Sequence, residues 1–154
     1  KAAGQKLGPF LLQFPSTFPA TDETAKRLDD FLGKAKKDLN GIRIAVEFRN
    51  DSWFTDDRLK ILKRHDAALV IPNSSKYPTP PVIATSKRFV YFRLHGPRKM
   101  FASGYSPKEL RDWARHMRMF HKQGKDVYVY FNNDMHAHAP ANGQLLQEIL
   151  PARR

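Results

Sequence analysis

The chain has 154 residues, which suits a single domain with a substantial core, and its 41% hydrophobic and 12% aromatic content argues against disorder. It has no cysteine, which excludes disulfides and thiolate metal sites, and no apolar run that could cross a membrane or form a signal peptide, so we expect a cytoplasmic protein without a membrane partner. The formal net charge of +12 is compatible with nucleic acid, anionic lipid or phosphorylated ligands, and equally with a basic proteome or improved solubility.

The first third of the chain predicts two strands, each followed by a helix. Residues 1–8 form a polar lead-in that we expect to be flexible. The apolar run 10–14 is bounded by prolines and predicts a strand, and the apolar spacing within 21–39 is that of a helix. Residues 42–48 predict the second strand, and 55–66 a shorter helix.

The middle of the chain predicts two further strands with an irregular segment between them. Residues 67–71 are a short apolar run that Pro72-Asn73 closes. Residues 74–86 contain three prolines and are expected to be irregular, and the aromatic run 89–94 predicts the fourth strand.

The last third predicts helix, strand and helix. In Ser106-Pro107-Lys108-Glu109 an N-cap serine, a proline at the first helical position and a capping-box glutamate mark a helix start. The β-branched and aromatic run 127–131 predicts the fifth strand, which ends abruptly in three polar residues. Residues 139–150 predict the last helix, and 151–154 form a basic tail.

Alternation of strands with helical segments indicates an α/β domain with a parallel sheet and crossover helices, here over residues 9–150. Five strands fit either an open doubly wound sheet or part of a (β/α)8 barrel. A whole barrel needs about 250 residues, so this chain is too short for an ordinary one.

Every predicted strand carries an ionisable or amide side chain at or just after its carboxyl end. In a parallel sheet these ends meet at one edge, which is where α/β folds bind ligands. Gln13 and Asn73 follow this pattern, and the candidate site residues are Glu47, Arg49, Trp53, Arg93, His95, Asn132, Asn133 and Asp134.

Each of these residues also has a structural explanation. Glu47 and Arg49 could form an ion pair that only stabilises the fold, and His95 could cap the turn before Gly96-Pro97. One of the two asparagines after the fifth strand could bond to the backbone, Asp134 could cap the next helix, and Trp53 fits packing better than ligand contact.

Convergence of these groups favours an enzyme-type pocket that acts by general acid–base chemistry on a small anionic (phosphorylated) ligand. The expected catalytic residues are Glu47, His95 and Asp134, and the expected ligand-binding residues are Arg49, Trp53, Arg93, Asn132 and Asn133. A metal bound by Glu47, His95, Asp134 and His136 is chemically reasonable, but no metal is predicted and the cofactor is undefined.

An alternative is a nucleic-acid-binding module. One stripe of the helix that begins at Ser106 carries five basic residues: Lys108, Arg111, Arg115, Arg118 and Lys122. Such a stripe would track phosphates without reading sequence, although the solvated outer face of a crossover helix would look the same.

The strand-end residues lie in stretches that resemble the YecE-like family, TIM-barrel proteins that form a domain-of-unknown-function family. The matching stretches run in family order across almost the whole chain: LGPFLLQFP (7–15), VEFR (46–49) with Ser52-Trp53, ALVI (68–71), YFRLHG (91–96), GYS (104–106) and VYVYFNND (127–134).

This resemblance implies a barrel whose pocket is lined by the candidate site residues, but it supplies no reaction. Family members begin with a Gly-Thr-Ser-Gly-Trp-like strand and two more strands that this sequence lacks, which implies a partial barrel of the last five strands. The open edges would then be covered by a second copy or by a completing chain, or the chain would be a non-catalytic, oligomer-forming remnant. Pro72-Asn73, Ala137 and Gly143 also depart from the family pattern, which usually has an acid after the third strand.

Overall fold

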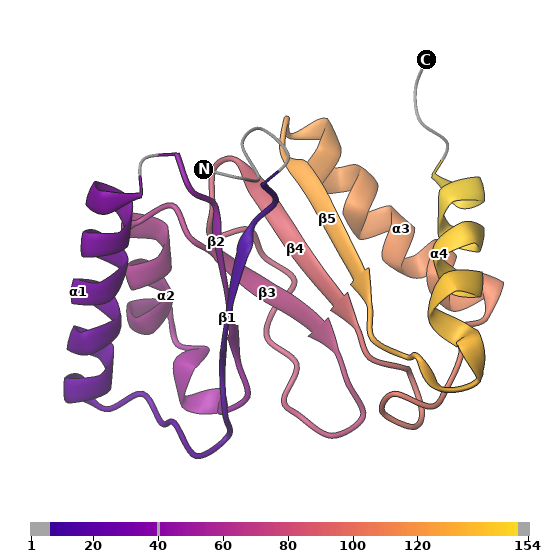
Figure 1. Cartoon of the computed structure of the whole chain (residues 1–154), viewed down its shortest axis with the longest axis horizontal. Coiled ribbons are helices and arrows are strands. Elements are labelled where there is room, and N and C mark those ends of the chain that lie inside the picture. Colours follow the sequence, from indigo (N-terminus) through magenta and orange to yellow (C-terminus); the bar gives the residue numbers. More distant parts are fainter. Residues whose placement is uncertain (1–6, 40, 151–154) are drawn as a thin grey trace.

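The computed structural model describes residues 7–39 and 41–150, and it shows an α/β fold with five strands and four α-helices (Figure 1). Residues 1–6 of the expected lead-in and the tail 151–154 lie outside the described residues. In chain order the elements are β1 (Phe10–Phe14), α1 (Asp22–Asp38), β2 (Ile44–Phe48), α2 (Asp56–Arg64), β3 (Ala68–Asn73), β4 (Phe89–Leu94), α3 (Pro107–Lys122), β5 (Asp126–Phe131) and α4 (His138–Ile149).

The five strands form one sheet in the order β1-β2-β3-β4-β5, and every neighbouring pair is parallel. The predicted parallel sheet is therefore confirmed. The register sets Gln13 beside Glu47 and Arg93 beside Tyr130, so the carboxyl ends of the strands share one edge of the sheet.

All four helices pack on the same face of this sheet. Helices α1 and α2 bury residues such as Leu32 and Leu62 against the β1–β3 side, and α3 and α4 bury residues such as Met117 and Leu146 against the β3–β5 side (Figure 1). The opposite face has its own buried cluster, which consists of Ala45, Ala68, Val70, Phe89 and Tyr91. The side chains at the strand ends on this second face form the site described below.

The helix starts follow the local signals in the sequence. Thr21 accepts a hydrogen bond from the backbone nitrogen of Thr24 at 3.2 Å and begins α1. Ser106 and Glu109 form the predicted capping box of α3, since each side chain accepts a hydrogen bond from the other's backbone nitrogen. Both helix starts are confirmed.

Several predicted boundaries are wrong by one or two residues, and three of them are described here. β2 begins at Ile44, and β3 continues through Pro72 to Asn73 instead of ending at residue 71. The proline is tolerated because β3 pairs with β2 only at Ala68 and Leu69, so no partner strand on that side needs the missing N–H of Pro72. α4 starts one residue early and follows a 3₁₀ turn, Met135–Ala137.

No helix in the part of the chain that the structure describes is long and apolar enough to span a bilayer.

Candidate functional site

An ion pair between β2 and β4, which are separated by β3, forms the floor of the candidate site. Glu47 is the penultimate residue of β2 and is 2% exposed, and Arg93 is the penultimate residue of β4. The Arg93 Nη1 donates to Glu47 Oε2 at 2.6 Å. β3 lies between them and contributes Val70 to the buried cluster on this face, so the two long charged side chains meet over a short apolar one.

Arg49 and Gln13 complete this cluster from the β1 side. Arg49 Nε donates to Glu47 Oε1 at 3.3 Å. Gln13 Oε1 accepts from Arg49 Nη2 at 3.1 Å and from Arg93 Nη1 at 2.8 Å. In a flat sheet β1 and β4 would be roughly 14 Å apart, so direct contact between Gln13 and Arg93 requires the sheet to curve towards this face.

Two further residues hold the arginines in place. Arg93 Nε donates to Asn132 Oδ1 at 3.1 Å, which connects the cluster to the end of β5. The guanidinium of Arg49 lies over the ring of Tyr77, 4.3 Å from its centroid, and Nη1 donates to the Tyr77 hydroxyl at 3.3 Å. Sequence reasoning missed Tyr77, because the irregular segment 74–86 has no pattern that predicts where its side chains point.

His95 is next to this cluster but buried beneath a loop. Its side chain is 1% exposed, its Nε2 is 4.0 Å from Glu47 Oε1, and the Phe101 ring packs edge-on at 5.7 Å. Burial is the main reason that the pKa of His95 is lowered to about 4; Glu47 opposes this change, and the charges of Arg93 and Arg49 add to it. The imidazole is therefore neutral at pH 7, and among the described residues its Nδ1 has no hydrogen-bond partner.

Two stacked tyrosines lie next to Arg93 on the same face: Tyr91 is two residues before it on β4, and Tyr130 is its register partner on β5. The Tyr91 and Tyr130 rings are 4.7 Å apart and nearly parallel. Burial, followed by the adjacent Tyr130, raises the pKa of Tyr91 to about 12, so the hydroxyl stays protonated at physiological pH. These rings give the site an apolar and uncharged base.

Trp53 and Asn133 are not part of the charged cluster. Trp53 is 1% exposed, stacks on Phe48 at 4.3 Å and donates from Nε1 to the carbonyl of Phe18, so it packs in the core under α1 and α2. Asn133 is fully buried, and its Nδ2 donates to the Ser103 carbonyl and to Asn142 Oδ1. Both side chains have structural partners here, and their expected contact with a ligand stays a prediction.

Asp134 is also separate from the cluster. It is exposed at the start of the 3₁₀ turn and makes no side-chain cap there. Among the described residues, no ion pair or hydrogen bond joins it to His95. Nor do the described residues contain any group of three or more metal-ligating acids or histidines that could hold an ion.

The converging groups leave the cluster with a positive charge. Two guanidinium groups share one carboxylate, and His95 is neutral at pH 7, so one positive charge is not compensated within the cluster. Arg93 Nη2 has no hydrogen-bond partner in residues 7–39 and 41–150, and Gln13 is exposed at the mouth of the cluster. Such an arrangement can bind the oxygen atoms of an anion.

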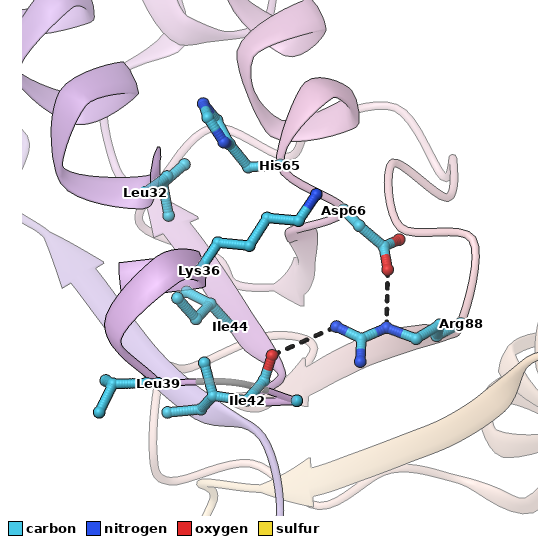
Figure 2. A pocket seen from close by; sticks show the side chains of 9 residues that line it. Leu32, Lys36, Leu39, Ile42, Ile44, His65, Asp66 and Arg88 are labelled. Carbon is cyan, nitrogen blue, oxygen red and sulfur yellow. Dashed lines mark hydrogen bonds and ion pairs between the residues drawn. The ribbon is translucent and has the colours of Figure 1, made fainter. Parts of the chain in front are cut away.

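An open pocket of about 370 Å³ lies at the opposite end of the sheet, between the end of α1 and the amino ends of the strands (Figure 2). Its walls include Leu32, Ile42 and Ile44, and its rim includes Arg88. Arg88 Nε donates to Asp66 Oδ2 at 2.6 Å, and Arg88 Nη2 donates to the Ile42 carbonyl. The carboxylate of Asp66 therefore compensates the charge of Arg88. None of the candidate site residues lines this pocket.

The whole chain, residues 1–154, matches the family described as "Protein of unknown function DUF72", and the chain belongs to this family. The expected membership of a domain-of-unknown-function family is thereby confirmed at this level.

Similar proteins include the UPF0759 protein YunF of Bacillus subtilis (strain 168), 29% identical over 168 residues that cover 94% of this chain and 58% of YunF. A crystal structure of a DUF72 family protein from Thermotoga maritima MSB8 has a TM-score of 0.83 at 25% identity, covering 96% of this chain and 59% of that chain. One from Enterococcus faecalis V583 has a TM-score of 0.82 at 27% identity, covering 97% and 61%. The chain thus spans about three fifths of the length of these relatives.

Proposed function

We propose that the strand-end cluster is the anion-binding part of an enzyme active site that acts on a small anionic, phosphorylated ligand by general acid–base chemistry. The observation that carries this proposal is the sharing of one buried carboxylate, Glu47, by Arg49 and Arg93. A fold that needed only a structural ion pair would not require the second guanidinium group, whose charge costs free energy in a partly buried place.

Each residue of the cluster has a distinct role in this proposal. Arg49 and Arg93 bind the anion through their planar N–H groups. Asn132 and Glu47 fix the Arg93 guanidinium in position, since both accept hydrogen bonds from it. Because His95 is neutral at pH 7 and lies beside Glu47, it serves as the uncharged proton donor or acceptor of the site.

Binding of inorganic phosphate at pH 7 and constant ionic strength tests the anion site. We expect saturable shifts of the arginine Nε–Hε signals in the wild-type protein, and an affinity at least about tenfold lower in Arg49→Gln, equivalent to about 1.4 kcal/mol. Phosphorus NMR of sugar phosphates and nucleotides mixed with the protein then tests turnover, with Glu47→Gln expected to be inactive. Absence of saturable phosphate binding by the wild-type protein would contradict the proposal.

A second candidate function is binding of nucleic acid by α3. All five residues of the predicted basic stripe are exposed, although Arg115 pairs with Asp112 and Arg118 donates to the carbonyl of Ile149. If this stripe binds phosphates, the affinity for DNA or RNA falls as the salt concentration rises. The slope of log affinity against log salt concentration is then about −0.9 for each phosphate contact. Lys108→Gln combined with Lys122→Gln should reduce the magnitude of that slope by about two, whereas neutralising Lys34 and Lys37 on α1 should not change it.

We also propose that the five strands, with their four helices, are the last five strands of eight in a TIM-barrel-like domain of the YecE-like type. Supporting this, the chain spans 58% to 63% of its relatives, close to five eighths. The curvature of the sheet towards the strand-end cluster, required by the Gln13–Arg93 contact, also agrees with a barrel interior. In such a barrel the missing strands would lie between the free edges of β1 and β5.

A further inference from the structure

Gln13 accepts hydrogen bonds from two arginines, a role that acidic residues have beside several other arginines of this chain. Three arginines that connect two elements elsewhere each pair with an aspartate: Arg43 with Asp126, Arg58 with Asp22, and Arg88 with Asp66. Arg49 and Arg93 have only Glu47 between them, and the other acceptor that they share is the neutral amide oxygen of Gln13.

The hydrogen bonds fix which way this amide points. Both neighbours of the Gln13 oxygen are guanidinium N–H groups, which can only donate, so the oxygen must face the arginines. The Gln13 NH₂ group is then directed away from the two guanidinium groups, and the residue is exposed at the mouth of the cluster. A ligand at the mouth would meet this NH₂ donor in addition to the arginines.

The choice of an amide determines the charge of the site. With glutamine at position 13, two guanidinium groups face one carboxylate, and one positive charge remains. Glutamate has nearly the same shape and would accept the same two hydrogen bonds, but two carboxylates would then balance two guanidinium groups. Lys76, which lies 5.6 Å from the Tyr77 ring, adds positive charge at the rim of the site.

We propose that Gln13 is the residue that makes this site selective for anions: it holds Arg49 and Arg93 in position without neutralising them, and presents its own NH₂ group to the bound anion. This inference rests on the proposed function and adds the residue that sets ligand charge. The ligand class is an oxyanion, such as a phosphate group, small enough to contact both guanidinium groups and the amide of position 13.

The decisive variant is Gln13→Glu, with inorganic phosphate as the probe. Phosphate is titrated at pH 7 against a chloride background that keeps ionic strength constant, and binding is followed by the arginine Nε–Hε signals. We expect phosphate affinity to fall at least tenfold in Gln13→Glu, because the added carboxylate neutralises the site and repels the anion. Gln144→Glu, an exposed glutamine on α4, makes the same change in net charge away from the site and should bind phosphate as the wild-type protein does.

A third variant separates charge from shape. Gln13→Ala removes the shared acceptor and the NH₂ donor but keeps the positive charge, so we expect it to bind phosphate more weakly than wild type and more tightly than Gln13→Glu. Circular dichroism and urea unfolding establish that each variant is folded; Gln13→Glu should be at least as stable as wild type because it completes the second ion pair.

The outcomes distinguish this inference from the proposal on which it rests. If the wild-type protein does not bind phosphate, the proposed anion site itself is wrong. If the wild-type protein binds phosphate and Arg49→Gln does not, but Gln13→Glu binds as tightly as wild type, the anion site stands and the role of Gln13 is overturned. Equal losses in Gln13→Glu and Gln144→Glu would show a general charge effect and also overturn it.

Discussion

The protonation of His95 depends on its burial and on the charged residues around it. Its imidazole is closed off by Phe101 and lies beside Glu47, which favours the charged form, and near Arg49 and Arg93, which oppose it. Burial is the largest of these effects and lowers its pKa to about 4. The surroundings therefore keep the ring neutral, and the folded protein loses stability when the pH is low enough to protonate this histidine in the unfolded chain.

Because the pKa of His95 is about 4 in the folded protein and about 6.5 in the unfolded chain, the unfolded chain binds more protons between these values. The free energy of unfolding should therefore fall as the pH drops from about 6.5 to about 4, by on the order of 3 kcal/mol from this residue alone. Urea unfolding at several pH values measures it. His95→Gln should flatten the slope in this window.

Acidic residues also contribute to acid sensitivity, so the informative quantity is the difference between curves. Asp66, whose carboxyl accepts hydrogen bonds from Lys87, Ser86 and Arg88, has a lowered pKa and loses its stabilising effect as the pH falls below the ordinary aspartate range. This contribution is the same in wild type and in His95→Gln. His116→Gln, on the exposed face of α3, should leave the pH slope unchanged, and an equal effect of both variants would contradict the assignment to His95.

At the scale of elements, α2 and α3 offer a matched comparison of two helix starts. Ser106 begins α3 with a complete capping box, while Thr55 begins α2 with no side-chain hydrogen bond to the helix. Ser106→Ala should lower the free energy of unfolding by about 1 kcal/mol, because the backbone nitrogen of Glu109 loses its partner. Thr55→Ala should cost less than about 0.5 kcal/mol in the same urea experiment. Equal costs would show that the capping bond contributes nothing specific.

The strands and helices could largely be predicted from the sequence. Apolar periodicity and capping signals are local, so they located all five strands and the four helices to within a few residues. Convergence of Glu47, Arg49, Arg93 and His95 followed from one global assumption, that the strands are parallel. The parallel arrangement brings polar strand ends together, as expected.

Side-chain partners beyond the strands could not be predicted in the same way. Tyr77 lies under Arg49 because of the path of an irregular loop, and no periodicity constrains that path. Asn133 and Trp53 are close in sequence to site residues, yet Asn133 bonds to the loop around Ser103 and Trp53 stacks in the helix-side core. A residue that follows a strand end in the sequence lies at that edge of the sheet, but its position in the sequence does not determine the direction in which its side chain points.

At the scale of the whole molecule, the unpaired edges of the sheet are the feature most open to test. Within residues 7–39 and 41–150, β1 and β5 are the outermost strands, and each has a neighbouring strand on only one side. β1 also begins with Phe10, which is 55% exposed, and Tyr130 of β5 is among the exposed aromatic residues. Open edges with exposed apolar side chains favour pairing with another chain, so the partial barrel and the oligomer proposals converge on the same surface.

We therefore expect the 154-residue chain to associate in a concentration-dependent manner, and Phe10→Lys to shift it towards monomer, since lysine on an edge strand opposes edge pairing. Light scattering coupled to size exclusion at two or more protein concentrations measures the mass. Phe31→Lys is the matched control, because Phe31 is similarly exposed but lies on α1, away from the hydrogen-bonding edge. A wild-type chain that stays monomeric throughout, or two variants with equal effects, would show that the edge of β1 does not drive association. Loss of association in Phe10→Lys alone would identify that edge as the surface which a second chain, or the remaining strands of a barrel, would cover.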